Sequence, residues 1–187
     1  MTKPSARTRI LQAAADRFYA DGISATGIDA IIADAGVAKM SLYNNFESKS
    51  GLVMAYLEQR HTEWLELYAA RLASSTSALE RVLAVVDAYI DHAEAGYAHG
   101  FRGCGLLNAA AELPVGEPGR AVVAGHKSQV RGFFAEHLEA NGCADPQEVA
   151  SHCSFVLEGA MALAGLEGNS SALRKARTLI RELAGGR

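Results

Sequence analysis

The sequence predicts an all-α chain. Apolar residues recur at three- and four-residue spacing along most of its length, and no run of alternating β-branched residues indicates a strand. With 187 residues, 49% hydrophobic and 21% charged, the composition is that of a globular protein and excludes a disordered or collagen-like chain. We find no internal repeat, so one compact domain or two small ones are expected.

The N-terminal part predicts three short helices followed by a long one. Ser5 or Thr8 can cap the first helix, and Gly22 supplies its stop. A second short helix ends at Gly36, because glycine readily adopts the positive φ that other residues avoid. A third short helical run comes next, and Ser48 opens the long helix.

The rest of the chain predicts further helices separated by short turns. Glycine, proline and N-capping residues mark where each of them begins or ends. The expected helical segments run over 75–96, 106–113, 120–141, 145–168 and 170–183.

The segment 31–46 carries the sharpest functional signal. Two short helices around a tight turn form the arrangement that braces one helix on the DNA backbone and places the next in the major groove. Gly36 permits the turn, Val37 fills the angle between the helices, and Leu42 points inward. The residues left to face outward are Lys39, Met40, Ser41, Asn44 and Asn45. An ordinary pair of packed helices is the alternative interpretation.

A dense set of residues in the N-terminal quarter points to a known family. These residues are Arg9-Ile10-Leu11, Ala13-Ala14, Phe18, Gly22, Thr26, Ile31, Ala35-Gly36-Val37, Leu42-Tyr43, Phe46, Lys49 and Leu52. In this order and spacing they resemble the DNA-binding domain of the TetR family of transcriptional regulators. Ile32 and Asn45 depart from the family pattern, which often has alanine and histidine there. The resemblance implies a helix-turn-helix DNA-binding domain at 1–50, with the motif at about 28–46, and a larger helical ligand-binding and dimerisation domain at 51–187.

The resemblance also implies individual roles in DNA binding. Thr26 and Gly27 would offer a phosphate the free backbone N–H groups at the start of the second helix. Tyr43 and Lys49 would clamp the DNA backbone, which positions the protein without reading the bases. The recognition helix would read the groove through Lys39 on guanine, Asn44 on adenine and Met40 on a thymine methyl, with Ser41 and Asn45 beside them. A basic arm of Lys3, Arg7 and Arg9 would reach an adjacent groove, unless the terminus is frayed.

The C-terminal part predicts a dimer interface. One such domain touches too few base pairs to find a genomic site, so family members act as twofold dimers on roughly palindromic operators. The segment 156–166 is apolar nearly all round, as expected for a helix covered by its own domain on one side and by a partner on the other. The expected homodimer interface consists of Leu157, Ala160, Met161, Ala164, Leu173, Ala176 and Ile180. A buried monomer core is the alternative.

The middle of the chain is expected to hold a pocket for a small-molecule effector. Pockets combine aromatic walls with a few polar groups, which selects Trp64, Tyr68, Tyr89, Phe101, Cys104, Asn108, Phe133, Phe134 and Phe155. Two or three of these residues should line the cavity, and the others should be ordinary core. Cys104 follows Arg102, a cation that would favour its thiolate and its reaction with oxidants or electrophiles, although a structural cysteine is the commoner case.

Enzyme signatures are absent from the sequence. Gly103-Cys104-Gly105 lacks the third glycine of a dinucleotide loop, and the six histidines form no H-E-x-x-H or i, i+4 pair. We therefore expect no catalytic residues, no cofactor and no metal site. The sequence shows no signal-peptide core, and no uncharged stretch approaches the about 20 residues that span a bilayer. A cytoplasmic protein without membrane contact is expected.

The function that these observations predict is sequence-specific regulation of transcription. The chain would be a homodimeric repressor whose partners are a palindromic double-stranded DNA operator and a small-molecule effector that releases it. The alternative is a helical small-molecule-binding protein or enzyme that keeps the N-terminal bundle without binding an operator.

Overall fold

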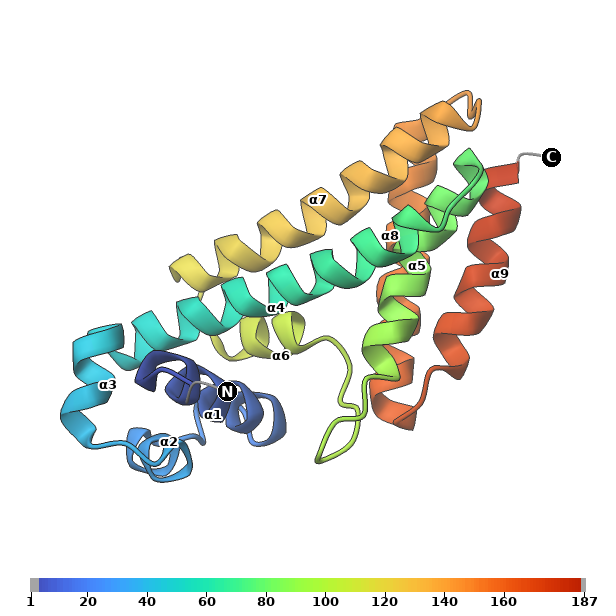
Figure 1. The fold of residues 1–187 in the computed structure, drawn as a ribbon. Helices are drawn as coiled ribbons and strands as arrows, with labels where there is room; N and C mark the ends of the chain where they lie inside the picture. The colour runs from blue at the N-terminus through green and yellow to red at the C-terminus, as the bar shows by residue number, and fades with distance from the viewer. Residues whose placement is uncertain (1–3, 186–187) are drawn as a thin grey trace. The chain divides into compact units, whose positions relative to one another are not determined.

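The computed structural model describes residues 4–185, and within that range every regular element is an α-helix (Figure 1). The all-α prediction is therefore confirmed. In chain order the helices are α1 (Ala6–Ala20), α2 (Ile28–Ala35), α3 (Lys39–Phe46), α4 (Lys49–Ala73), α5 (Ala78–Ala93), α6 (Gly105–Glu112), α7 (Pro118–Ala140), α8 (Pro146–Glu167) and α9 (Ser171–Gly185).

The chain forms two compact units. The first unit consists of the chain up to His61 and of Gly105–Val123, which contains α6 and the start of α7. The second unit consists of Thr62–Cys104 and the chain from Ala124 onward. Helices α4 and α7 each contribute residues to both units. This division differs from the expected boundary at residue 50, because α6 packs on α1 from a distant part of the chain.

In the first unit, α1 packs against α2, α3 and α6. Ile10 and Phe18 lie on its buried face, as their spacing requires, and Phe18 meets the Tyr56 ring of α4 edge-on with 5.5 Å between centroids. Ile31 of α2 and Leu42 of α3 are fully buried. These few apolar anchors fix the faces that α2 and α3 turn to solvent.

Specific caps set the ends of the first helices. The Ser5 hydroxyl accepts the Thr8 N–H at 3.1 Å, and Gly36 ends α2 with a left-handed φ of 60°. The Arg9 guanidinium donates to the carbonyl oxygens of Ala35 and Gly36 at 2.8 and 3.0 Å. Arg9 of α1 thus satisfies the end of α2 and holds the turn in place.

In the second unit, α9 packs against both α8 and α5 (Figure 1). Ser77 and Glu80 form a reciprocal capping box that begins α5. Asp145 caps α8, whose first residue is Pro146. The Arg177 guanidinium donates to the Asp87 carboxylate at 2.6 Å, a contact that joins α9 to α5.

Helix α8 is unusually apolar. A segment of 18 residues has a mean hydropathy of 1.4, which by length and composition suffices for a membrane span, and 33% of that segment is buried. Glu158 interrupts this segment, so no long uncharged stretch indicated it in the sequence. Core helices of globular proteins have the same composition, and α8 packs on α9 and α5.

Candidate DNA interface and effector region

Helices α2 and α3 form a helix-turn-helix within the first unit. Gly36, Val37 and Ala38 make the turn, and α3 then begins at Lys39. Because Leu42 and Phe46 are the buried residues of α3, the opposite face of this helix is open. That face carries exposed side chains of Met40, Tyr43, Asn44 and Asn45, with Ser41 half-buried. The structure therefore brings the predicted base-reading residues onto one surface.

Lys39 is held by an ion pair that the sequence analysis missed. Its ammonium lies 2.9 Å from the Asp29 carboxylate of α2, and 55% of the Lys39 side chain is exposed. The hydrogen bond to Asp29 raises the pKa of Lys39 above its ordinary value. Lys39 remains cationic at the surface, but a base contact has to compete with Asp29.

The two asparagines of α3 differ in their hydrogen bonds. The Asn45 side-chain NH2 group donates to the Ser41 carbonyl at 2.7 Å, so this group is engaged within its own helix. Asn44 makes no side-chain hydrogen bond to any of residues 4–185 and is exposed. Asn44 is thus the freer of the two for a bidentate contact with a base.

Thr26 does not offer a free backbone N–H to a phosphate, contrary to the expectation. It is 2% exposed, and its hydroxyl donates to the Gly22 carbonyl at 2.6 Å. Its own N–H donates to the Ile23 carbonyl, so Thr26 stabilises the turn between α1 and α2. Gly27 is exposed and forms the N-cap of α2 without a side-chain cap, as expected for a free backbone N–H.

Lys49 is the first residue of α4 and is half-buried. The chain reaches it through a tight junction in which Glu47 has a φ of 55° and the Ser48 N–H donates to the Phe46 carbonyl. At Gly51 a Cβ atom would collide with the Phe46 carbonyl oxygen, so only glycine fits there. This junction sets where the Lys49 ammonium lies with respect to α3.

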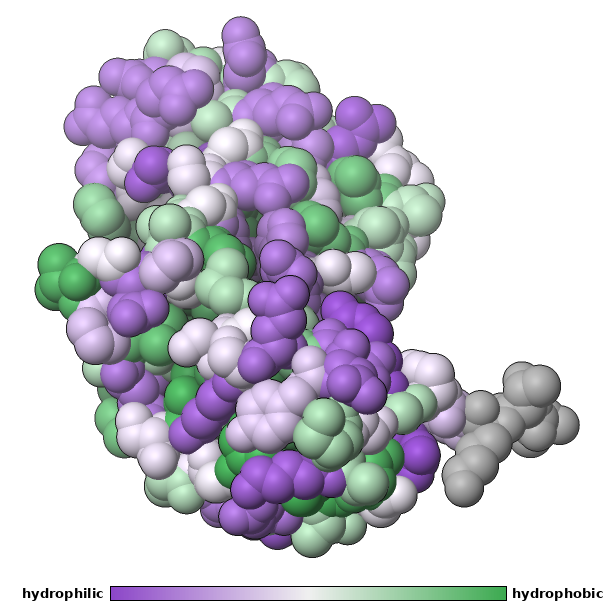
Figure 2. Space-filling model, turned by 90° about the vertical axis from the view of Figure 1, so that its left-hand side faces the viewer, coloured by the Kyte–Doolittle hydropathy of each residue, from purple (hydrophilic) through white to green (hydrophobic). Residues whose placement is uncertain are grey.

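The predicted basic arm is only partly available. Arg9 binds the end of α2, and the Arg7 guanidinium lies over the Phe46 ring at 4.5 Å, where it contributes to packing. Lys3 lies outside the described residues. Figure 2 looks onto the side of the first unit where α3 lies in Figure 1, and hydrophilic side chains there are interspersed with small apolar groups.

In the second unit, part of the predicted effector set forms an aromatic cluster. Trp64 stacks on Tyr68 at 5.5 Å, and Tyr68 stacks on Phe133 at 4.6 Å between centroids. The Tyr68 hydroxyl and the His137 Nε2 atom share a hydrogen bond of 2.6 Å, and burial raises the pKa of Tyr68 to about 12. The Trp64 indole N–H is buried without a hydrogen-bond partner. These rings pack on one another, with one polar group left unsatisfied.

Other members of the predicted effector set lie elsewhere. Phe155 is 71% exposed on α8, so it is a surface residue rather than a pocket wall. Asn108 is exposed on α6 and belongs to the first unit. Phe134 is fully buried, and Phe101 packs edge-on against His92 at 5.9 Å. The structure therefore does not gather the whole predicted set.

Cys104 lies beside a half-buried cation that the sequence did not indicate. The Lys127 ammonium is 3.6 Å from the Cys104 sulfur, 3.3 Å from the Tyr89 hydroxyl and 2.7 Å from the Glu158 carboxylate. Burial lowers the pKa of Lys127, but these three neighbours outweigh it and hold the pKa above its ordinary value. The second Glu158 oxygen is buried without a partner. Lys127, rather than the sequence neighbour Arg102, is the cation at this sulfur.

The residues expected to form the dimer interface belong to the core instead. All of them are at most 7% exposed within the single chain: Leu157, Ala160, Met161, Ala164, Leu173, Ala176 and Ile180. They fill the space where α8 and α9 pack, which leaves them unavailable to a partner. The apolar surface of this region lies on other residues, which are Phe155, Leu163 and Leu166 of α8 and Leu179 of α9. The sequence pattern could not tell the covered face of α8 from the free one.

A tight helix-turn-helix that exposes polar groups on its second helix, joined to a second helical unit, defines the class of helix-turn-helix DNA-binding regulators. Residues 10–56 match the family model of bacterial regulatory proteins of the tetR family, and residues 78–180 match that of the tetracyclin repressor-like C-terminal domain. The chain belongs to the TetR family of transcriptional regulators. Members of this family have a DNA-binding helix-turn-helix domain and a ligand-binding C-terminal domain, and they are generally not enzymes.

Solved structures and a curated relative agree with this assignment. A TetR-family transcriptional regulator from Streptomyces coelicolor is 31% identical, with a TM-score of 0.82 over 95% of this chain and 96% of that one. A putative regulator of the same kind from Streptomyces avermitilis ma-4680 is also 31% identical, with a TM-score of 0.76 over 98% and 100%. The HTH-type transcriptional activator FasR of Mycolicibacterium smegmatis is 34% identical over 88 residues, which are 47% of this chain and 40% of that protein. The match thus spans less than half the length of that curated relative.

Proposed function

We propose that the protein is a homodimeric repressor that binds a palindromic operator and is released by a small-molecule effector. The observation that carries this proposal is the orientation of α3. Its buried residues Leu42 and Phe46 fix the helix, and Met40, Tyr43 and Asn44 are left exposed on the opposite side. A helix held in this way can enter the major groove with its polar face toward the base edges.

Within this proposal the residues divide the work of DNA recognition. Asn44 and Lys39 read bases, and Met40 contacts a thymine methyl group. Tyr43 and Lys49 hold phosphates, as does the Gly27 N–H at the start of α2. Asp29 competes with DNA for the Lys39 ammonium. We therefore expect Lys39 to prefer guanine, because the two acceptors of guanine can replace the carboxylate better than a single, weaker acceptor can.

The dimer is proposed to form through the exposed apolar face of α8 and α9. Phe155, Leu163 and Leu166 are 71%, 53% and 86% exposed, and Leu179 of α9 adds to them. At Gly159 a Cβ atom would meet nothing within 4 Å, so a partner helix could approach closely at the middle of this face. Exposed apolar side chains at helical spacing mark an association surface, and family members are dimeric.

Release by an effector requires coupling between the two units. Helix α4 runs from Lys49 in the first unit to Ala73 in the second, so a change around Trp64 and Tyr68 would be passed along one helix to Lys49. The operator-bound form places the two recognition helices about 34–36 Å apart. An effector that binds more tightly to a form with a different spacing releases the DNA. Shifting the two forms from a ratio of 1:99 to 99:1 needs about 5.5 kcal/mol of differential affinity. DNA is the partner, so the protein would act in the cytoplasm.

Selection of binding sites from random duplex DNA by the purified protein tests this proposal. The selection is carried out at two salt concentrations, because non-specific binding falls steeply with salt whereas an operator keeps its advantage. A palindrome enriched at both concentrations is the expected result. Weak binding that disappears at the higher salt, with no enriched sequence, would instead favour a helical binding protein or enzyme that keeps only the fold.

The sign of regulation needs a second readout, because the curated relative FasR is named an activator. The selected operator is placed upstream of a reporter, and expression is compared with and without the protein. A repressor lowers expression, whereas an increase would assign activation to this chain as well.

A further inference from the structure

We propose that Asp29 determines sequence specificity by turning Lys39 from a phosphate-binding group into a base-reading one. Asp29 lies in the first turn of α2, and Lys39 is the first residue of α3. The Lys39 Nζ atom donates to Asp29 Oδ1 at 2.9 Å, so this ion pair joins the two helices of the helix-turn-helix. The proposal rests on the proposed function, because it concerns how the protein distinguishes an operator from other DNA.

The helix-turn-helix carries little positive charge. Over residues 28–46 the sequence holds one cation, Lys39, and two carboxylates, Asp29 and Asp34. Arg17 of α1 pairs with Asp34, which leaves Lys39 and Asp29 as a neutral pair at the surface. Non-specific binding depends on cations that neutralise phosphates and release their counterions. A lysine whose charge is already balanced contributes little to it.

Asp29 balances the charge of Lys39 without using all of its donors. A lysine ammonium has three N–H donors, and one of them is engaged by Asp29. The Lys39 side chain is 55% exposed, so the remaining donors are open to a partner. The pair therefore presents hydrogen-bond donors at the surface with almost no net charge.

Such a group discriminates between the two kinds of acceptor on DNA. Guanine O6 and N7 are neutral acceptors, so they can bind the two remaining donors of Lys39 while Asp29 stays in place. A phosphate is an anion, and the Asp29 carboxylate beside the ammonium repels it. Because specificity is a difference between two affinities, weakening the phosphate contact raises the preference for the operator.

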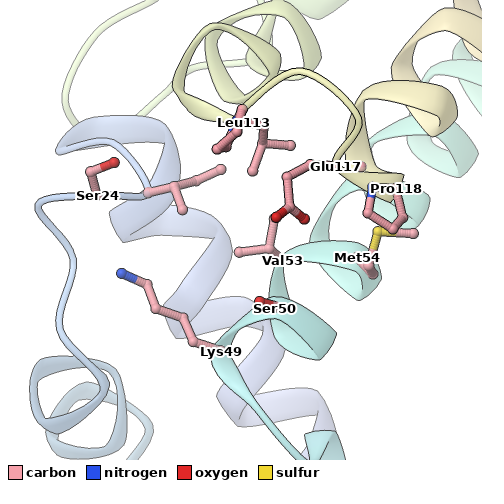
Figure 3. A pocket seen from close by; sticks show the side chains of 11 residues that line it. Ser24, Lys49, Ser50, Val53, Met54, Leu113, Glu117 and Pro118 are labelled. Carbon is pink, nitrogen blue, oxygen red and sulfur yellow. The ribbon is translucent and has the colours of Figure 1, made fainter.

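Lys49 provides the contrast within the same unit. It begins α4, and within residues 4–185 it has no hydrogen-bond or ion-pair partner. Figure 3 shows its ammonium on the Ser24 side of a cavity of about 300 Å³. An ammonium without a counter-ion can bind any phosphate, so Lys49 retains the sequence-independent role that Asp29 takes from Lys39.

Fluorescence anisotropy on a scrambled duplex, over a range of salt concentrations, tests the proposal in Asp29→Asn. Asparagine keeps the size of the side chain and one acceptor for Lys39 but removes the charge. We expect this variant to bind the scrambled duplex about fivefold more tightly than the wild type at low salt, because Lys39 becomes free to neutralise a phosphate. The salt slope should become steeper by about one. On the operator the gain should be less than about twofold, so the preference for the operator falls.

A matched control separates the ion pair from the net charge of the protein. Asp16→Asn removes an exposed carboxylate of α1 that accepts from Gln12 rather than from a cation. It should change the affinity for the scrambled duplex less than about twofold, because no lysine or arginine is released. A gain as large as that of Asp29→Asn would overturn the proposal, since net charge alone would then explain both. Wild-type affinity of Asp29→Asn for the scrambled duplex would also overturn it.

Removal of the whole pair gives the second test. Lys39→Ala combined with Asp29→Asn removes one charge of each sign, so the affinity for the scrambled duplex and its salt slope should stay at wild-type values while the preference for the operator falls. Weaker binding of the scrambled duplex with a flatter slope would show that Lys39 binds phosphates in the wild type, which refutes the proposal. The measurements on scrambled DNA need no operator, so they decide on Asp29 even if the site selection finds no palindrome.

Discussion

The Glu112 carboxylate at the end of α6 accepts the backbone N–H of Ser24 at 2.7 Å, although 88 positions separate the two residues in the sequence. Its other oxygen accepts the Ile23 N–H at 3.0 Å. Burial raises the pKa of Glu112, but these N–H groups and the Lys49 ammonium outweigh burial, so the pKa lies below its ordinary value of 4.5. Helix α6 thereby holds the turn from which α2 begins.

Replacing Glu112 by glutamine should loosen that turn. The variant keeps an acceptor but loses the charge, and we expect the free energy of unfolding at pH 7 to fall by about 1 kcal/mol, allowing for solvent exposure. A carboxyl with a lowered folded-state pKa contributes stability above its ordinary pKa and loses it as the pH falls. The difference between wild type and Glu112→Gln in urea unfolding should therefore shrink below about pH 4.5. A difference that does not change with pH would contradict the assigned role of the charge.

Gly51 is required by the junction between α3 and α4. In Gly51→Ala the added Cβ atom would collide with the Phe46 carbonyl oxygen, which is backbone and cannot move alone. We expect a loss of about 1–3 kcal/mol in thermal unfolding and weaker DNA binding. Gly132→Ala is the matched control, because a Cβ atom there meets nothing within 4 Å on helix α7. That control should be neutral or slightly stabilising.

His137 should make the second unit sensitive to mild acid. Burial lowers the pKa of His137 from 6.5, with Arg81 acting in the same direction and Glu136 against it. The unfolded chain then binds the proton more readily, so stability is lost as the pH falls below about 6.5, by at most about 1.4 kcal/mol per pH unit. His137→Gln should remove this part of the loss between pH 7 and 5.5 in thermal unfolding. An unchanged pH profile would show that His137 is not responsible for the loss of stability in mild acid.

The exposed face of α8 should govern the oligomeric state. Phe155→Glu combined with Leu166→Glu places charges on that face, and we expect the dimer dissociation constant to rise at least about a hundredfold. Sedimentation velocity measures the change. Val115→Glu, at a residue 94% exposed in the first unit, is the control and should leave the dimer intact. If the double variant dimerises like the wild type, the interface lies elsewhere.

Local patterns were sufficient to predict the helix-turn-helix. Gly36 has the left-handed φ that its residue type suggested, and Leu42 is buried as its spacing required. The helix boundaries also follow local capping, as Ser5 and Asp145 show. These features depend on a few neighbouring residues, which one sequence displays directly.

Contacts between distant residues were not predictable from the sequence. The Lys39–Asp29 pair joins two helices, and the Lys127 ammonium reaches Cys104 from another part of the chain. On α8, an apolar pattern all round the helix did not indicate which face α9 covers, so the residues chosen for a partner proved to be core. Thr26 was expected to offer its backbone N–H to DNA because of its position, whereas that N–H donates to the Ile23 carbonyl oxygen within the turn.

In the proposed function, α3 reads bases while the start of α4 holds the DNA backbone. The direct test measures the affinities of wild type, Lys39→Ala and Lys49→Ala for the selected operator and for a scrambled duplex over a range of salt concentrations. Lys39→Ala should reduce the preference for the operator, at a cost of about 1–3 kcal/mol on the operator alone. Lys49→Ala should weaken both duplexes about equally and reduce the salt slope by about one. An equal loss of preference in both variants would contradict this division of roles between α3 and α4.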